Sequence, residues 1–479
     1  MLNWSSNRHR TIQLALFGLA LAPRVFYLAV ARSPFDNYNW ALAGSLLRDG
    51  SLSIGSVKTT AFEPLYPLFL AVCRAFVGDR SWAVQAIQCA LGALGAPLLC
   101  RLAASLTGRE RVGLISGALY AVYPLSIRYG GNISDATLMT VLVLGFAYAF
   151  ATAHTRWRAA GAGVCLGLMM TTRMMTLPLL PLGAALLGRD RGARAAAAFA
   201  SAAIVIVAPY ALRNYALNGW MLPTRSGLNL FISNCEYTAK VLPDYGPDIL
   251  EDYAQTMLAR RAPWVGPPSP LQERAADRAF TRLAIEHIAA DPMGTLRLRL
   301  QNVLYFFSPV LVPRRDPTAA TIFHIDDDGR ATIENGAQRP IVDRVVYTLS
   351  YAPIAALALG GIWTRRRQLR RDGILWATVV TFVGVHAMYF PTTRYRLPIE
   401  FVLLFYSAVA IERSSGRETS RSRNLGSDTN QPANAVLDTV PSTAVTRCTM
   451  SAAMRNRMAS PAPVFGASMR IAAESLRRS

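Results

Sequence analysis

Residues 133–158 read ISDATLMTVLVLGFAYAFATAHTRWR, and this stretch decides the fold class. About twenty residues in a row are almost all apolar, which is the length that an α-helix needs to cross a bilayer. A carboxylate, Asp135, stands at one end of the apolar run, and Arg156 and Arg158 follow its other end. An apolar run of this length with polar ends indicates a membrane-spanning helix.

The whole chain has the composition of a polytopic membrane protein. Of its 479 residues, 52% are hydrophobic and only 16% are charged, whereas soluble domains carry about 25% charged residues. This balance excludes a soluble α/β enzyme and disorder over most of the chain. The net charge of +21 comes almost entirely from arginine, since lysine occurs only at Lys58 and Lys240. Because the arginines cluster between apolar runs, the charge follows the orientation rule of membrane proteins, and we expect no nucleic-acid partner.

We predict about ten membrane spans. The first, Thr11–Ala31, could also be a signal peptide, but its length and the Pro23-Arg24 interruption favour a retained helix. The apolar segment Pro64–Val77 is too short to cross and is expected to lie in the interface or to dip inward. The other spans are expected near residues 81–106, 112–129, 133–153, 159–170, 174–187, 195–212, 345–363, 374–390 and 397–411.

The distribution of charge predicts the orientation of these spans. Short loops rich in arginine, near residues 101–111, 156–158, 189–194 and 365–371, are expected on the cytoplasmic side. The long segment 214–344 holds 14 basic and 15 acidic residues, so this balanced segment and loop one, residues 32–63, are expected outside.

The chain therefore divides into four predicted parts. Residues 1–213 form an N-terminal transmembrane module, 214–344 an extracytoplasmic segment, 345–412 the C-terminal transmembrane helices, and 413–479 a disordered basic cytoplasmic tail. Within 214–344 we expect helices at 271–290 and 295–307, and strands at 321–325 and 330–334. The aspartates at 326–328 could bind a divalent cation, but their place between the strands favours a polar hairpin turn.

Three carboxylates lie at the predicted outer ends of apolar segments: Asp36, Glu63 and Asp135. Asp36 and Asp135 could each simply cap the helix that follows, because aspartate accepts hydrogen bonds from free helical N–H groups. Ionisable groups at the edge of the hydrocarbon are nevertheless costly and often functional. Three of them at one membrane face therefore form a candidate catalytic set.

Four arginines are predicted on the same side: Arg173, Arg213, Arg394 and Arg396. A guanidinium group presents a fixed fork of donors that suits phosphate oxygens. The alternative is that these side chains anchor the helices to lipid headgroups. Because the arginines face carboxylates, a phosphate-binding site is the preferred interpretation.

The sequence resembles the polyprenyl-phosphate-dependent glycosyltransferases of the GT-C superfamily, in the family 39 or protein-mannosyltransferase-like group. The resemblance extends from about residue 35 to residue 410. The matching motifs are the Asp36 loop, Glu63-Pro64-Leu65-Tyr66-Pro67, Ser134-Asp135-Ala136, Thr172-Arg173, Leu212-Arg213-Asn214-Tyr215 and Arg394-Tyr395-Arg396-Leu397-Pro398. It implies an all-α polytopic membrane protein, a GT-C-like bundle of about ten transmembrane helices with a mixed extracytoplasmic segment.

The resemblance also implies an activity. A hexosyl or pentosyl group would move, with inversion, from a polyprenyl-phosphate-linked donor to a lipid, glycan or protein acceptor. The reaction would take place at the outer face of a cytoplasmic membrane, in a chain whose arginine and alanine content suggests a bacterial origin. A transporter or lipid flippase without glycosyl transfer is the alternative, and a catalytically silent scaffold is a third reading.

The same resemblance assigns roles to the candidate residues. Asp36 would be the general base, Glu63 would orient the acceptor or sugar, and Asp135 would position one of these groups. The donor phosphate would be held by Arg213 with Arg394 or Arg396, and by Arg173 at an outer turn. Many relatives carry a second acid where this chain has Asn37, so no metal ligands are predicted, and a divalent metal stays open as a cofactor.

Overall fold

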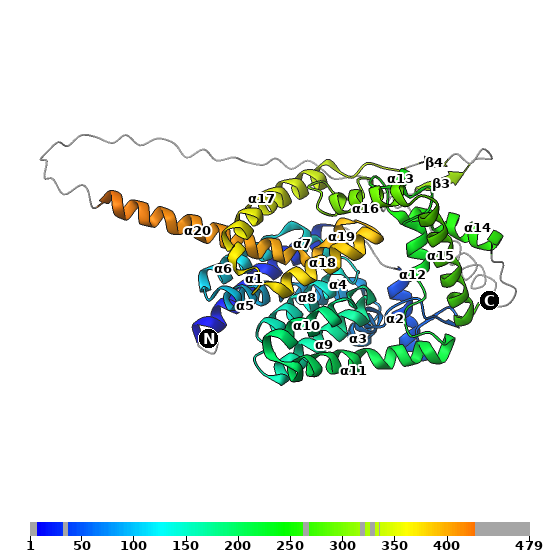
Figure 1. The fold of residues 1–479 in the computed structure, drawn as a ribbon, viewed down its shortest axis with the longest axis horizontal. Coiled ribbons are helices and arrows are strands. Elements are labelled where there is room, and N and C mark those ends of the chain that lie inside the picture. The colour runs from blue at the N-terminus through cyan, green and yellow to red at the C-terminus, as the bar shows by residue number, and fades with distance from the viewer. Residues whose placement is uncertain are drawn as a thin grey trace, which may run out of the picture.

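A computed structural model describes residues 7–31, 37–261, 268–316, 321–325, 331–334 and 336–426. These residues are almost entirely helical (Figure 1). The described strands form two short antiparallel hairpins, in which β1 (Ser53–Ile54) pairs with β2 (Val57–Lys58) and β3 (Ile322–Ile325) pairs with β4 (Ala331–Glu334). The predicted all-α class is therefore confirmed, and the strands predicted at 321–325 and 330–334 are present as the paired β3 and β4. Asp36 and the aspartates at 326–328 lie outside the described residues.

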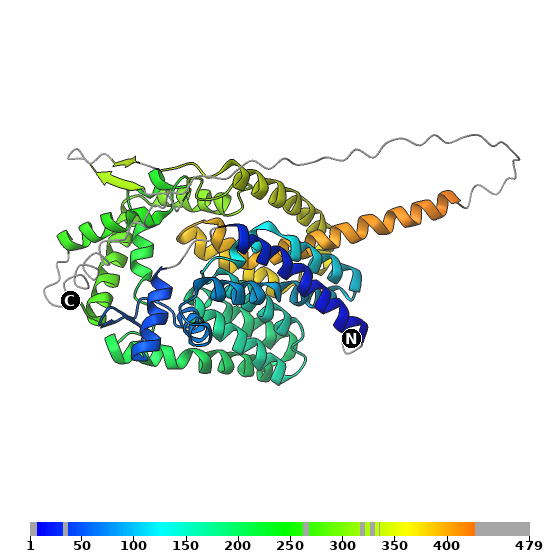
Figure 2. The same ribbon diagram turned by 180° about the vertical axis from the view of Figure 1, so that it is seen from behind.

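The N-terminal module is a bundle of helices, some of which cover only part of a predicted span. α1 lies across the outside of the bundle in Figure 2, and α11 runs along one edge in both views. The helices are α1 (Asn7–Val30), α2 (Asn37–Asp49), α3 (Leu65–Val77), α4 (Ser81–Ala93), α5 (Gly95–Thr107), α6 (Glu110–Val122), α7 (Pro124–Gly130), α8 (Ala136–Ala151), α9 (Arg156–Thr172), η1 (Met174–Thr176), α10 (Leu179–Arg191) and α11 (Ala193–Asn218).

Proline accounts for a clear break within a predicted span. Tyr123, with φ −71° and ψ 115°, is extended between α6 and α7 because the ring of Pro124 disfavours the helical conformation at the residue before it. By length and composition, the described residues include four helices able to cross a membrane: Asn7–Val30, Ser81–Thr107, Ala193–Asn218 and Ile341–Gln368. Three shorter apolar helices are Leu65–Val77, Ala136–Ala151 and Gly373–Met388. Fewer helices than the ten predicted spans therefore reach full length among the described residues.

The bundle exposes large apolar side chains along its outer helices. Leu14 on α1, Val205 on α11 and Leu359 on α17 (Ile341–Arg365) are each more than half exposed. Such a surface is unfavourable in water and favourable in lipid. These helices therefore present a lipid-facing surface, as a multi-pass membrane protein requires.

The segment between α11 and α17 builds a second hydrophobic core beside the bundle. Phe231, Tyr237 and Phe280 are buried in it, and Phe390, from the chain after α18, joins them. Both predicted helices are present, as α15 and α16. The elements are α12 (Ser226–Ile232), α13 (Thr238–Val241), η2 (Pro247–Leu250), α14 (Glu251–Arg261), α15 (Pro270–Ala290) and α16 (Pro292–Phe306).

The last helices return to the bundle. They are η3 (Arg366–Gln368), α18 (Gly373–Met388), α19 (Thr393–Arg396), η4 (Leu397–Ile399) and α20 (Glu400–Gly426). The end of α20 projects from the bundle in Figure 1. α20 continues to Gly426, past the predicted start of the tail at residue 413. Once a helix has formed, each further residue adds a backbone hydrogen bond at little cost, so polar residues can extend an apolar helix.

The close packing of α17 on α20 yields a stability prediction. A Cβ atom at Gly361 would lie 1.9 Å from the backbone oxygen of Tyr406, whereas one at the adjacent Gly360 would meet only the Cβ of Ala410, at 4.0 Å. Gly361→Ala should therefore lower the free energy of unfolding by about 1–3 kcal/mol through overpacking. Gly360→Ala, the matched control, should leave it unchanged or slightly raised. Unfolding in detergent measures both, and equal effects would contradict the packing.

Candidate active site

Asp135 lies between two arginines that come from distant parts of the chain. Arg173 donates both Nε and Nη2 to its carboxylate, with Nη2 2.6 Å from Oδ1, and Nη2 of Arg394 lies 2.9 Å from the same oxygen. Asp135 occupies the N-cap position of α8, but its side chain makes no capping hydrogen bond. The capping alternative is therefore wrong for this residue. We refer to Asp135, Arg173 and Arg394 as the Asp135 cluster.

The local chain conformation brings the two arginines to Asp135. Arg173 follows the last residue of α9 and is extended, with φ −153° and ψ 112°, so the chain leaves the helix axis at this point. Arg394 belongs to α19, which begins just after Pro391, a residue that cannot continue α18. Within the cluster, the side chains of Asp135 and Arg173 are each 12% exposed and that of Arg394 is 36% exposed. Arg394 is thus the member most accessible to a ligand.

Aromatic rings support the cluster. The Arg173 guanidinium lies 4.5 Å from the ring centroid of Tyr395, and Arg394 lies 5.7 Å from it. Tyr395 in turn stacks on His386, with the ring centroids 4.7 Å apart and the planes 6° apart. Stacking on flat rings restricts the orientation of both guanidinium groups. The sequence interpretation missed His386, whose only signal was a lone histidine in an apolar span.

Glu63 adjoins the cluster through the residue next to Arg173. Its Oε1 accepts a hydrogen bond of 2.9 Å from the backbone N–H of Met174. Burial raises the pKa of Glu63, and the Asp135 carboxylate adds to the rise, while the Met174 bond and the charge of Arg173 oppose it. A carboxyl group with a raised pKa exchanges its proton closer to neutral pH, which is a property of groups that bind or activate a hydroxyl.

A second cationic group lies near the residue before Glu63. The rings of Tyr38 and Phe62 stack with centroids 5.8 Å apart, and the Arg225 guanidinium lies 5.8 Å and 5.4 Å from these two rings. Arg225 forms an ion pair with Glu251. Burial opposes the charge of Arg225, but Glu251 and neighbouring groups outweigh it, so the pKa of Arg225 is raised. The sequence interpretation missed Arg225, which lies outside the motifs identified in the sequence.

Arg213 contacts loop one rather than the Asp135 cluster. Its Nη1 donates to the backbone oxygen of Thr59 at 3.0 Å, and its Nη2 donates to that of Leu52 at 3.2 Å. Thr60 of the same loop donates its backbone N–H to Glu273 of α15, at 2.7 Å. Loop one is therefore held from the end of α11 and from the outer segment.

Arg396 lies in the interior, although it is only two residues from Arg394. Its side chain is 1% exposed and is ion-paired with Glu400 at 2.7 Å. It also donates to the backbone oxygen of Phe306, at 2.6 Å, and its guanidinium stacks 3.8 Å from the ring centroid of Tyr351. The predicted role of Arg396 in binding the donor phosphate is therefore not supported, because its donors are engaged inside the protein.

The structure thus brings together four of the seven predicted site residues, namely Glu63, Asp135, Arg173 and Arg394. Within the described ranges, no three His, Cys, Asp or Glu side chains form a group that could hold a metal ion. Both oxygens of Asp135 accept hydrogen bonds from guanidinium groups, so cations already neutralise this carboxylate.

The fold is similar to that of a solved oligosaccharyltransferase. The oligosaccharyltransferase of Archaeoglobus fulgidus, solved as a complex with Zn and sulfate, aligns with a TM-score of 0.50 and 12% sequence identity. The alignment covers 87% of this chain and 51% of that one, so this chain spans about half the length of the archaeal protein. ArnT from Cupriavidus metallidurans, bound to undecaprenyl phosphate, aligns with a TM-score of 0.35 and 14% identity over 85% of this chain and 79% of that one. The chain therefore shares the fold of the archaeal oligosaccharyltransferase over the aligned region.

The sequence gives a narrower relationship for part of the chain. Residues 60–212 match the family of dolichyl-phosphate-mannose-protein mannosyltransferases. No match was found among curated proteins. The matched region contains Glu63, Asp135 and Arg173. The predicted resemblance to the protein-mannosyltransferase-like group is thus confirmed for residues 60–212.

Removing the central carboxylate should destabilise the protein. In Asp135→Asn the Arg173 charge would lose its buried counter-ion, which should lower the free energy of unfolding by about 3 kcal/mol. Asp343→Asn is the matched control, because Asp343 pairs with Arg128 at 2.8 Å but both side chains are more exposed, at 32% and 27%. Its cost should be about 1 kcal/mol or less. Denaturant unfolding in detergent measures the free energy of unfolding of both variants. A smaller loss in Asp135→Asn than in Asp343→Asn would contradict the buried ion pair.

Proposed function

We propose that the chain is a membrane glycosyltransferase that moves a sugar from a polyprenyl-phosphate-linked donor to an envelope acceptor. The transfer is inverting and takes place at the outer face of the cytoplasmic membrane. The observation that carries this proposal is the Asp135 cluster beside Glu63, where two guanidinium groups and two carboxyl groups meet at the end of an apolar helix. The match of residues 60–212 to a family named for a lipid-phosphate sugar donor supports the choice of donor.

Arg394 is the proposed contact for the donor phosphate. Two guanidinium groups face one carboxylate in the cluster, which leaves an excess positive charge. Arg394 has the larger exposed fraction, 36% against 12% for Arg173, so it is the group that an arriving phosphate meets. As the polyprenyl phosphate leaves, its negative charge grows, and a guanidinium already held in place by Asp135 stabilises that charge without reorganisation. Asp135 and Arg173 act as positioning residues.

The acceptor side of the reaction is assigned to Asp36 and Glu63. Asp36 takes the proton of the acceptor hydroxyl while that hydroxyl attacks the anomeric carbon from the face opposite the leaving phosphate. Tyr38, two residues after Asp36, stacks on Phe62, the residue before Glu63, and this contact supports a shared site. Glu63, whose pKa is raised by burial, orients a sugar or acceptor hydroxyl by hydrogen bonding.

Arg213 is given a different role from that predicted from the sequence alone. Its bonds to the backbone oxygens of Leu52 and Thr59 make it a positioning residue for loop one. It therefore acts on the donor only through the loop that carries the acidic residues. Arg396, buried with Glu400, has no role in the proposed chemistry.

The general-base assignment predicts the behaviour of Asp36→Asn. Transfer of radiolabelled sugar from lipid-linked donors, measured in membranes, should fall on the order of a hundredfold or more, because an amide cannot accept the proton. Asp49→Asn, an exposed acid at the end of α2, is the control and should keep full activity. Undiminished transfer by Asp36→Asn would remove this residue from the mechanism. Movement of substrate across the membrane without formation of a glycosidic bond would favour a transporter.

The phosphate assignment predicts a specific kinetic change in Arg394→Gln. The KM for the lipid-linked donor should rise about tenfold or more, because a charge-assisted hydrogen bond to phosphate is lost. The KM for the acceptor should stay constant. Arg278→Gln, at an exposed position on α15, controls for the loss of one positive charge outside the Asp135 cluster. A rise in the KM for the acceptor alone would contradict the assignment of Arg394 to the donor phosphate.

A further inference from the structure

A second charged site lies at the opposite end of the bundle from the Asp135 cluster. A cavity of about 590 Å³ opens between the start of α6, the end of α17 and α20. The start of α17 lies at the same end of the bundle as the Asp135 cluster. There Asp343 of α17 pairs with Arg128 of α7, and Arg128 is seven residues before Asp135 in the chain. Arg365, which lines the cavity, is 22 positions further along the chain, near the other end of α17 and roughly 33 Å away at the helical rise.

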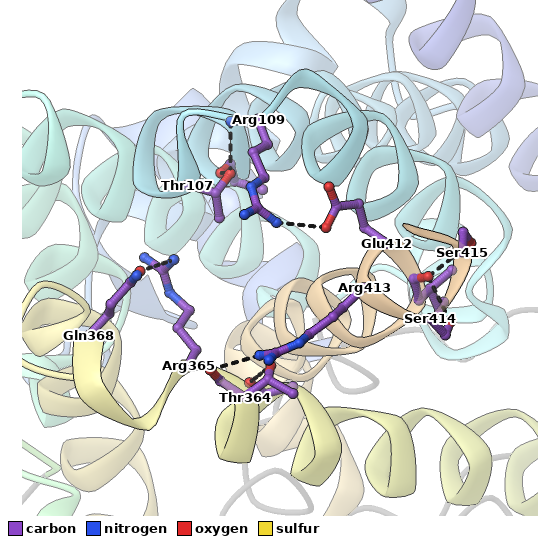
Figure 3. A network of polar contacts seen from close by, with 12 residues as sticks. Thr107, Arg109, Thr364, Arg365, Gln368, Glu412, Arg413, Ser414 and Ser415 are labelled. Atoms are coloured by element: carbon purple, nitrogen blue, oxygen red, sulfur yellow. Dashed lines mark hydrogen bonds and ion pairs between the residues drawn. The ribbon is translucent and has the colours of Figure 1, made fainter. Parts of the chain in front are cut away.

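Three guanidinium groups line this cavity: Arg109 from the connection between α5 and α6, Arg365 from α17 and Arg413 from α20 (Figure 3). Arg365 is fully engaged, with Nε 2.7 Å from Oδ2 of the buried Asp372 and Nη1 2.7 Å from Oε1 of Gln368. This second bond fixes the amide of Gln368, so its nitrogen is the end that can donate to a ligand. Arg365 therefore holds Gln368 in position and does not itself bind the ligand.

The other two arginines keep donor capacity. Arg109 has a side chain that is 62% exposed and pairs with Glu412 at 2.8 Å through Nη1. Arg413 is exposed, and its Nη1 lies 3.4 Å from the backbone oxygen of Thr364. Each guanidinium has five N–H donors, so these contacts use a minority of those available. Two cations against the single carboxylate of Glu412 make the cavity suited to an anion.

The neighbourhood of the cavity indicates which anion. Guanidinium groups bind the oxygens of a phosphate through two parallel hydrogen bonds. Val112 and Val409 also line the cavity, so it has an apolar wall beside the charged groups. This end of the bundle carries the arginine-rich loops expected at the cytoplasmic leaflet, where anionic lipids are enriched and basic pockets between helices bind their headgroups.

We propose that this cavity binds the phosphate of an anionic membrane phospholipid. Arg109 and Arg413 contact the phosphate oxygens, Gln368 donates from its fixed amide, and the valines face the glycerol end of the lipid. The site is separate from the proposed glycosyl transfer and does not depend on it.

Lipid retention by the full-length chain tests this site. The protein is placed in phosphatidylcholine nanodiscs with increasing fractions of phosphatidylglycerol, and bound lipid is counted by native mass spectrometry after release. The variant Arg109→Gln with Arg413→Gln should retain phosphatidylglycerol at least about tenfold more weakly. The matched control is Arg111→Gln with Arg367→Gln, which removes two exposed arginines from the same end of the bundle that do not line the cavity. The control should retain lipid like the parent chain.

A second variant acts in the opposite direction. Glu412→Gln removes the carboxylate that competes for Arg109, so phosphatidylglycerol retention should rise severalfold, a gain that misfolding cannot produce. Equal retention by the Arg109/Arg413 variant and the parent would overturn the proposal. So would the absence of a rise in Glu412→Gln, or binding of inorganic phosphate as tight as that of phosphatidylglycerol, which would indicate a soluble anion.

Discussion

The candidate site depends on one carboxylate that bridges two guanidinium groups. Asp135 connects the start of α8 to the chain between α9 and η1 through Arg173, and to α19 through Arg394. Three chain segments are thereby joined where a buried charge alone would be costly. Because Met174 follows Arg173 and donates its backbone N–H to Glu63, the same bridge also fixes the carboxyl group at the end of loop one. An arrangement of this kind holds positive charge in place before a substrate arrives, which is the condition for electrostatic catalysis.

Much of the fold could be predicted from the sequence, since a membrane span is a local property of the chain. Apolar runs located the helices in both halves of the bundle, and charge balance set the segment 214–344 apart. The interruptions were harder to predict. The break at Tyr123 could be predicted only by noting that Pro124 disfavours the helical conformation at the residue before it. The polar end of α20 continues a helix beyond the point where hydropathy predicts its end.

The site could be predicted only in part, because its members meet through tertiary structure. Arg394 and Arg396 are two residues apart in the same motif, and residues two apart on a helix face different directions. One arginine therefore reaches Asp135, while the other is buried against Glu400 and Tyr351. Arg213 likewise contacts backbone oxygens that no sequence pattern could identify. The aromatic supports Tyr395 and His386 come together only because the chain turns between α18 and α19.

The central claim is that the Asp135 cluster receives the phosphate of a lipid-linked sugar. It is tested most directly by cryo-electron microscopy of the full chain in lipid nanodiscs with a polyprenyl phosphate. The account predicts phosphate density within hydrogen-bonding distance of Arg394, with Asp135 still paired to Arg173. Density for the phosphate only at a distant position, with the cluster empty at saturating lipid, would contradict it.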